Sequence, residues 1–237
     1  MNNKTGLIFD LDGTLVDSMN FLGEVACEVL NQIYGLNSHD ALKAYKTTSG
    51  KPFEYQIENI YPADSRNGRA VELFNKLKES KYFESSFFKE VPDVLASLKE
   101  SGFKLFVSSN SYHELVIRKT GELKINFDAV FGMKPGFLKG RAHFSKIMEG
   151  YPCEHYLFFG DSIHDARVAF ENKIPFYARL GTNAEKDFEA LSGVIGMAYH
   201  FNNLSSFLKQ DFSSFKSDET LKNRSYPLKS DELRAHS

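Results

Sequence analysis

Residues 7–17 combine an apolar run with two closely spaced carboxylates, and this combination constrains the fold more than any other segment. Residues 7–9 (Leu-Ile-Phe) are typical of a buried strand, and Asp10 and Asp12 follow before a Gly-Thr turn. On an extended chain the two carboxylates lie on the same side, roughly 6–7 Å apart. Two such anions repel each other, and a divalent cation such as Mg²⁺ would compensate them. The alternative is a solvated Asp-Leu-Asp-Gly turn.

A second acidic turn follows another apolar run far downstream. Residues 156–160 read Tyr-Leu-Phe-Phe-Gly, and Asp161 and Asp165 lie where a helical pattern begins. In a parallel α/β sheet the carboxyl ends of the strands line one edge, and ligands bind in the crevice there. We therefore expect Asp161 and Asp165 to approach Asp10 and Asp12 in space.

Polar and cationic candidates lie between the two acidic turns. The strand-like residues 103–107 lead into Ser-Ser-Asn-Ser at 108–111, a predicted strand-end loop in which Ser109 and Asn110 could hold phosphate oxygens. A site of several carboxylates plus a phosphate also needs a fixed positive charge. Lys134 and Lys139 are the candidates, and Lys139 is preferred because a helical pattern begins directly after it.

The distribution of helical and strand patterns predicts an α/β fold with an insertion. Residues 18–88 carry about four helical patterns and no strand signal, whereas a crossover between parallel strands needs a single helix. From residue 91 helices alternate with strands, and right-handed crossovers bring the strands into one parallel sheet. Together with the first strand, the expected strands are residues 103–108, 128–132, 156–160 and 175–179. Residues 217–237 are polar and charged, as in a loose tail.

The order of these motifs resembles a known family. Residues 10–14 (Asp-Leu-Asp-Gly-Thr), the strand end at Ser109, a loop lysine and residues 160–165 (Gly-Asp-Ser-Ile-His-Asp) resemble the four motifs of the haloacid dehalogenase superfamily of hydrolases. The resemblance covers roughly residues 5–182 and is greatest to its phosphatases with a helical cap, the phosphoglycolate phosphatase and β-phosphoglucomutase-like members.

The resemblance implies a domain organisation. It implies a Rossmann-like parallel sheet core and an inserted all-helical cap domain. The expected core comprises residues 1–17 and 89–216, the cap comprises residues 18–88, and the tail comprises residues 217–237.

The resemblance also implies roles for the acidic residues. Asp10 would be the nucleophile that forms an aspartyl-phosphate, and Asp12 would protonate the leaving alcohol and then activate water. Mg²⁺ would be held by Asp10, the backbone carbonyl of Asp12, and Asp161. Asp165 would support the site by orienting the lysine or the waters on the metal.

Further residues would bind the substrate. Ser109 and the N–H of Asn110 would bind phosphoryl oxygens, while the lysine stabilises charge in the transition state. In capped relatives a loop closes over the leaving group, and residues 47–53 (Thr-Thr-Ser-Gly-Lys-Pro-Phe) occupy that position here. Gly50 permits close backbone approach and Lys51 could meet an anionic substrate. The alternative for this segment is an ordinary helix start.

Asp12 also distinguishes among reactions of the family. Expulsion of halide needs no proton, whereas an oxygen leaving group does, so the sequence favours a Mg²⁺-dependent hydrolase of small phosphomonoester metabolites. A sugar-phosphate mutase is an alternative because it shares the Asp pair. A receiver that takes a phosphoryl group only to switch conformation, or a catalytically silent binding protein, is a further alternative; the insertion argues against the former and the intact aspartates against the latter. Sequence does not name the leaving group.

Composition excludes several other classes of partner. A net charge of −2 over 237 residues offers no electrostatic basis for binding nucleic acid or an anionic membrane. Apolar stretches are strand-sized rather than membrane-spanning. The first strand begins within a few residues of Met1, so we expect no signal peptide and a cytoplasmic protein. Cys27 and Cys153 lack the spacing of a metal site.

Overall fold

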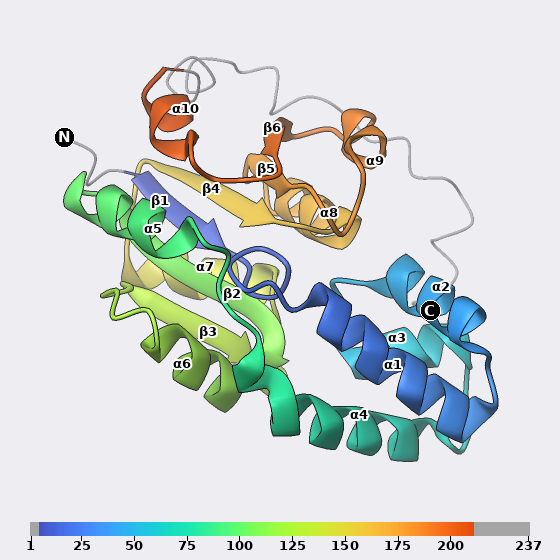
Figure 1. Cartoon of the computed structure of the whole chain (residues 1–237). Helices are drawn as coiled ribbons and strands as arrows, with labels where there is room; N and C mark the ends of the chain where they lie inside the picture. The colour runs from blue at the N-terminus through green and yellow to red at the C-terminus, as the bar shows by residue number, and fades with distance from the viewer. Residues whose placement is uncertain (1–4, 211–237) are drawn as a thin grey trace.

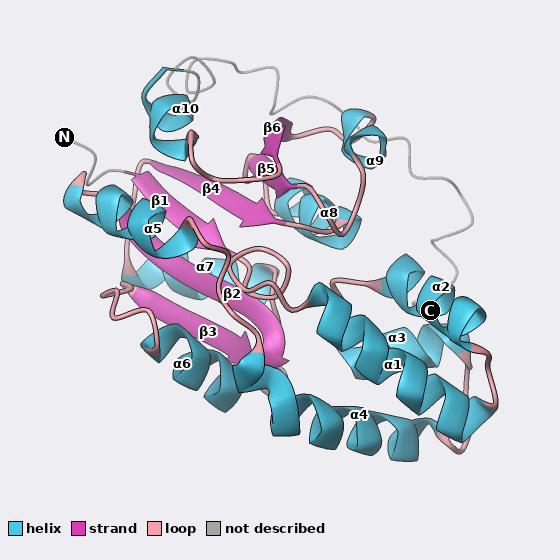
Figure 2. Ribbon diagram, viewed as in Figure 1, coloured by secondary structure: helices cyan, strands magenta, loops and turns pink. Residues whose placement is uncertain are grey.

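The computed structural model describes residues 5–210, in which six parallel strands form one sheet in the order β3-β2-β1-β4-β5-β6 (Figure 1, Figure 2). The strands are β1 (Thr5–Phe9), β2 (Lys104–Tyr112), β3 (Ala129–Met133), β4 (His155–Gly160), β5 (Phe176–Arg179) and β6 (Val194–Ala198). The helices that follow the insertion are α5 (Val91–Glu100), α6 (His113–Gly121), α7 (Arg141–Gly150), α8 (Ile163–Glu171), α9 (Glu185–Glu189) and α10 (Leu204–Gln210). The expected α/β class with a Rossmann-like parallel sheet and a helical insertion is confirmed.

Alternation along the central strands creates the two faces of the sheet. In β1, Leu7 and Phe9 belong to one hydrophobic cluster and Ile8 belongs to the other, because successive side chains point to opposite faces. Phe9 stacks on Phe159 of the neighbouring β4 with ring centroids 4.6 Å apart. Helices α5, α6 and α10 contribute to the first cluster, and α7, α8 and α9 contribute to the second. With every residue of β1 buried, this strand forms a fixed base for the residues that follow it.

The helical insertion lies between β1 and β2 and has a hydrophobic cluster of its own (Figure 1). Its helices are α1 (Met19–Tyr34), α2 (Ser38–Thr48), α3 (Phe53–Ile60) and α4 (Asn67–Lys81), followed by the short 3₁₀ turn η1 (Tyr82–Glu84). These four helices agree with the about four helical patterns expected over residues 18–88. We propose residues 18–88 as the cap domain and 1–17 with 89–216 as the core, of which residues 1–4 and 211–216 lie outside the described part of the chain. The separate cluster supports this division.

The two chain segments that connect the cap to the sheet pair with each other. The N–H of Asp17 donates to the carbonyl of Ser86 at 2.9 Å, and the N–H of Phe88 donates to the carbonyl of Leu15 at 3.0 Å. This short backbone pairing fixes the cap next to the loop that carries Asp10 and Asp12.

Two expectations about strands need correction. β6 was not predicted, although Val194–Ala198 is a short apolar run after Gly193; the run is only half-buried and carries a glycine, so its pattern is weak. Residues 108–111 were expected to be a loop, but β2 continues to Tyr112 with a register shift against β3 between Ser108 and Tyr112. The predicted tail at 217–237 lies outside the described residues. Within residues 5–210, no helix is both long enough and apolar enough to cross a membrane.

Candidate active site

The order in which the chain adds strands to the sheet reverses between β1 and β4, and the acidic residues lie at that point. The chain adds β2 and β3 on one side of β1 and then returns to place β4 on the other side. Carboxyl ends of strands at such a switch point form a ligand crevice. β1 and β4 pair up to Phe9 and Phe159, and the N–H of Asp10 donates to the carbonyl of Phe159 at 2.8 Å. This register places Asp10 beside the turn that contains Asp161.

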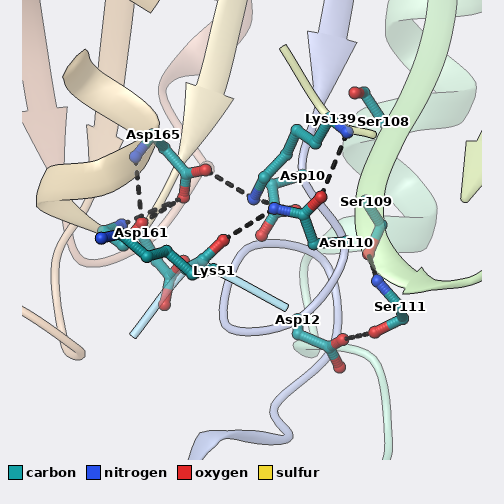
Figure 3. Close-up of polar contacts among 12 residues, drawn as sticks. Asp10, Asp12, Lys51, Ser108, Ser109, Asn110, Ser111, Lys139, Asp161 and Asp165 are labelled. Atoms are coloured by element: carbon teal, nitrogen blue, oxygen red, sulfur yellow. Dashed lines mark hydrogen bonds and ion pairs between the residues drawn. The ribbon is translucent and has the colours of Figure 1, made fainter. Parts of the chain in front are cut away.

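Lys139 joins two of the buried carboxylates. Its ammonium lies 2.9 Å from Oδ1 of Asp10 and 2.5 Å from Oδ1 of Asp165 (Figure 3). Burial alone would lower the pKa of Lys139, but the two carboxylates raise that pKa above its ordinary value. Lys139 is therefore a permanent cation inside the cluster.

Local structure at the start of α8 fixes the other two acidic side chains. Ser162 is the N-cap residue of α8: its hydroxyl accepts from the N–H of Asp165 at 3.1 Å and donates to Oδ2 of Asp165 at 2.7 Å. This capping box uses one oxygen of Asp165 and leaves the other for Lys139. Asp161 accepts a hydrogen bond from the hydroxyl of Thr182, which follows β5.

The cluster carries more negative than positive charge. Oxygens of Asp10, Asp161 and Asp165 lie within 4.8 Å of one another, and all three residues are buried. Burial, Asp165 and Asp12 raise the pKa of Asp10 to about 7 against the opposing effect of Lys139. Burial, Asp165 and Asp10 likewise raise the pKa of Asp161 well above its ordinary value. Carboxylate oxygens are the hard ligands that Mg²⁺ prefers, so the neighbouring carboxylates of Asp10 and Asp161 fit a divalent cation.

Asp12 lies apart from this cluster and faces the cap. Its Oδ1 accepts hydrogen bonds from the hydroxyls of Ser18 at 2.7 Å and Tyr82 at 2.6 Å. Its Oδ2 accepts from the hydroxyl of Ser111 at 2.5 Å and lies 3.3 Å from the ammonium of Lys78. Burial would raise the pKa of Asp12, but Lys78 and the three hydroxyls together hold that pKa below its ordinary value.

Asn110 links the predicted cap loop to the lysine loop. Its side-chain amide donates to the carbonyl of Gly50 at 2.9 Å, and its oxygen accepts from the N–H of Lys139 at 3.1 Å (Figure 3). Ser109 is buried, and its hydroxyl accepts from the N–H of Ser111 at 3.0 Å. Gly50 and Lys51 both line the cavity above Asp10.

Lys134 lies on a turn that precedes Lys139. The N–H of Lys134 and that of Phe137 each donate to the other's carbonyl at 2.9 Å, which closes a turn over Gly136 at φ 72°. The side chain of Lys134 is exposed on this turn. Lys134 is not among the residues that line the cavity above Asp10, and its supporting role stays a prediction.

A cavity of about 220 Å³ lies between the cap and the sheet edge. The site residues at its base are Asp10, Asp12, Ser109, Asn110, Lys139 and Asp161. Its cap wall is mixed: apolar side chains come from Met19, Leu22, Tyr45, Phe53, Val71 and Phe74, and polar or charged ones from Ser49, Lys51, Glu54, Gln56, Asn75, Lys78 and Glu79. The cavity thus has a charged base and a cap wall of apolar and charged side chains.

Sequence reasoning missed the residues that hold Asp12 and Asp161. Ser111 belongs to the polar run 108–111, and Thr182 follows the predicted strand 175–179 by three residues. Their positions near strand ends could therefore have identified both as candidate site residues. Lys78 and Tyr82 do not lie near any predicted strand end. They lie in or just after an amphipathic cap helix, where a lysine normally indicates a solvated face.

Comparison with known proteins assigns the family. Residues 7–178 match the family model described as haloacid dehalogenase-like hydrolase. The chain therefore belongs to the haloacid dehalogenase-like hydrolase family. A 5'-nucleotidase from Pseudomonas aeruginosa is 26% identical over 181 residues, which cover 71% of this chain and 79% of that protein. A phosphoglycolate phosphatase from Aquifex aeolicus is 30% identical over 129 residues, 53% of this chain and 59% of that protein. The chain is thus similar in sequence to one protein named as a nucleotidase and to one named as a phosphatase.

Solved structures share the fold at low sequence identity. A haloacid dehalogenase-like hydrolase from Streptococcus pneumoniae superposes with a TM-score of 0.74 at 22% identity and covers 88% of this chain and 100% of that one. A protein from Clostridium acetobutylicum described as a predicted phosphatase gives a TM-score of 0.75 at 21% identity, covering 87% of this chain and 99% of that one.

Proposed function

We propose that this enzyme is a Mg²⁺-dependent phosphomonoester hydrolase of small phosphorylated metabolites that works through an aspartyl-phosphate on Asp10. The observation that carries the proposal is the buried group of Asp10, Asp161 and Asp165 around Lys139, with Asp12 beside the same cavity. Family membership supports the reaction class. Phosphatase and nucleotidase relatives support phosphorylated small molecules as substrates.

The proposed first step is attack by Asp10 on phosphorus. Because Lys139 holds Oδ1 at 2.9 Å, the attack is assigned to Oδ2. An Oδ2–P bond forms while the bond between phosphorus and the alcohol oxygen breaks. Asp12, which its lowered pKa leaves ionised before substrate binds, takes a proton from the monoanionic phosphate of the substrate and passes it to that oxygen. Lys139 and the hydroxyl of Ser109, with the N–H of Asn110, hold the phosphoryl oxygens.

In the second step the aspartyl-phosphate is hydrolysed. Asp12, now ionised, takes a proton from a water molecule that attacks phosphorus, and Asp10 leaves as the free carboxylate with release of inorganic phosphate. The hydroxyls of Ser18, Tyr82 and Ser111 keep Asp12 oriented through both steps.

Asp10, Asp161 and the backbone carbonyl of Asp12 would hold Mg²⁺. When bound, the metal would neutralise charge between the nucleophile and the phosphate. The chain's own contribution is to bury the carboxylates so that they attract a cation. The ion pair between Asp165 and Lys139 keeps the lysine beside Asp10. Gly50 and Lys51 are proposed to contact the substrate from the cap.

A screen of phosphorylated metabolites with purified protein tests the proposal. We expect phosphate release with Mg²⁺, loss of release in EDTA and recovery on adding Mg²⁺ in excess, whereas Ca²⁺, which accepts more ligands in a looser geometry, should inhibit. Asp161→Ala should raise the Mg²⁺ requirement or abolish activity. Full activity in chelator would contradict the metal requirement. Isomerisation of a sugar phosphate without net phosphate release would favour a mutase instead.

A further inference from the structure

His143 is a fully buried histidine four residues after Lys139, and the proposed reaction does not use it. It lies in the first turn of α7, and its Nδ1 is 2.9 Å from the hydroxyl oxygen of Ser108 on β2. Ser108 is fully buried as well. The imidazole ring packs against Phe137 and Phe131, whose ring centroids lie 4.4 Å and 5.6 Å from its own.

Packing alone does not explain a histidine at this position. Its Nε2 is buried and has no hydrogen-bond partner within residues 5–210, and an unpaired buried polar atom is destabilising. An apolar side chain of similar size would avoid that cost. Burial lowers the pKa of His143 to about 4 against the opposing effect of the Phe137 backbone, and Lys139 adds to the lowering. At neutral pH the uncharged ring therefore bonds to Ser108 without placing a second cation beside Lys139.

Both neighbours of Ser109 bond to the segment that carries the lysine. Ser108 and Asn110 are two residues apart on β2, a spacing that directs side chains to the same face of a strand. Ser108 contacts His143, and the side-chain oxygen of Asn110 accepts from the N–H of Lys139 at 3.1 Å (Figure 3). The start of α7 is thus tied to β2 at the residue before Ser109 and at the residue after it.

We propose that His143 is a positioning residue whose hydrogen bond with Ser108 fixes the distance between the Ser109 hydroxyl and the Lys139 ammonium. The inference rests on the proposed hydrolase function, in which both of these groups hold phosphoryl oxygens. Their separation must match the oxygens of the phosphoryl group in the transition state, and a misplacement of about 1 Å can cost about a hundredfold in rate. His143 does not line the cavity, so it acts through the strand end and the helix start.

Substitutions on both sides of this hydrogen bond test the proposal. His143→Leu and Ser108→Ala each remove the bond, and we expect each to lower kcat by about tenfold or more while KM changes less than about threefold. Vanadate, which resembles the phosphoryl group in the transition state, should inhibit each variant more weakly by about the same factor. His143→Asn keeps a polar atom on Cγ that can pair with Ser108 and should recover part of kcat.

The double variant Ser108→Ala/His143→Leu separates positioning from stability. With both partners apolar no hydroxyl is left unpaired, so its melting temperature should be no lower than that of His143→Leu. Its kcat should be lowered by the same factor as in each single variant, because all three proteins lack the same bond. Ile147→Val, a buried change in the same helix, is the matched control and should lower the melting temperature but keep the wild-type kcat. If His143→Leu does not fold, Ser108→Ala and His143→Asn provide the comparison.

Three results would overturn the proposal. The first is a kcat within about twofold of wild type in the single variants. The second is recovery of kcat together with the melting temperature in the double variant, which would make the bond purely structural. The third is a pair of losses that multiply in the double variant, which would show that the two residues act separately. Failure of the parent function is distinguishable, because the wild-type protein itself would then release no phosphate in the presence of Mg²⁺.

Discussion

Asp10 is the proposed nucleophile, and its side chain is buried. Asp10→Asn removes the nucleophile and one of three mutually repelling charges, so we expect activity below about one per cent of wild type and a melting temperature that does not fall. Phosphate release and thermal unfolding measure both. Asp17→Asn, an exposed change in the same loop, is the control and should remain active. An active Asp10→Asn enzyme would rule out Asp10 as the nucleophile.

The two candidate lysines differ sharply in their surroundings. Lys139→Ala leaves the carboxylates of Asp10 and Asp165 without their shared cation, and we expect kcat to fall by about a hundredfold or more. Lys134→Ala changes an exposed turn residue and should leave kcat within about twofold of wild type. Steady-state kinetics on the best substrate of the screen compare the two variants. The reverse order of losses would transfer the charge-stabilising role to Lys134.

The loop between α2 and α3 packs against the core at Gly50, where the absence of a side chain allows the loop backbone to approach the start of α8. Gly50 has φ 91°, and a side chain there would overlap Ser162 and His164. Gly50→Ala should therefore lift the loop from Asn110 and lower kcat/KM by about tenfold or more, a loss typical of misplaced closing elements. Gly35→Ala is the matched control: φ is 75° but nothing lies within 4 Å. It shares the backbone strain and should keep kcat/KM. Equal losses in both variants would attribute the effect to strain and not to loop docking.

A buried ion pair connects the sheet, the cap linker and the C-terminal part of the described chain. The guanidinium of Arg179 lies 2.9 Å from Glu90, with its carbon 3.4 Å from the ring centre of Phe88. The same oxygen of Glu90 accepts from the N–H of Phe201 at 3.2 Å. Burial alone would raise the pKa of Glu90, but backbone hydrogen bonds and Arg179 hold that pKa below its usual value.

This ion pair predicts a pH dependence of the stability of the whole molecule. Since the pKa of Glu90 is lower when folded, its stabilising effect is full above the unfolded pKa, near 4.5, and is lost as pH falls through the folded pKa. Glu90→Gln leaves Arg179 buried without its partner and should lower the free energy of unfolding by about 3 kcal/mol at pH 7. The difference from wild type should shrink below about pH 4. Urea unfolding at both pH values tests this, and a difference independent of pH would show that packing and not charge is responsible.

Patterns along the chain were sufficient for the fold and for most of the acidic residues. The β1 run is buried on both faces and reads as a strand at once, and the cap helices follow from their 3.6-residue periodicity. Asp10, Asp161 and Asp165 were found because strand ends in a parallel sheet must share one edge. β6 escaped because a half-buried strand with a glycine has little periodicity to detect.

The sequence by itself therefore determined the α/β class, the helical insertion and the grouping of carboxylates at one sheet edge, since these depend on local periodicity and on the handedness of crossovers. Only the tertiary structure decided which lysine joins Asp10 to Asp165, and that Ser18, Lys78, Tyr82 and Ser111 surround Asp12. Those contacts join residues up to 129 positions apart, across the cap and the core. The closeness of such residues is set by how two separately folded clusters pack against each other, and no periodicity within either segment encodes it.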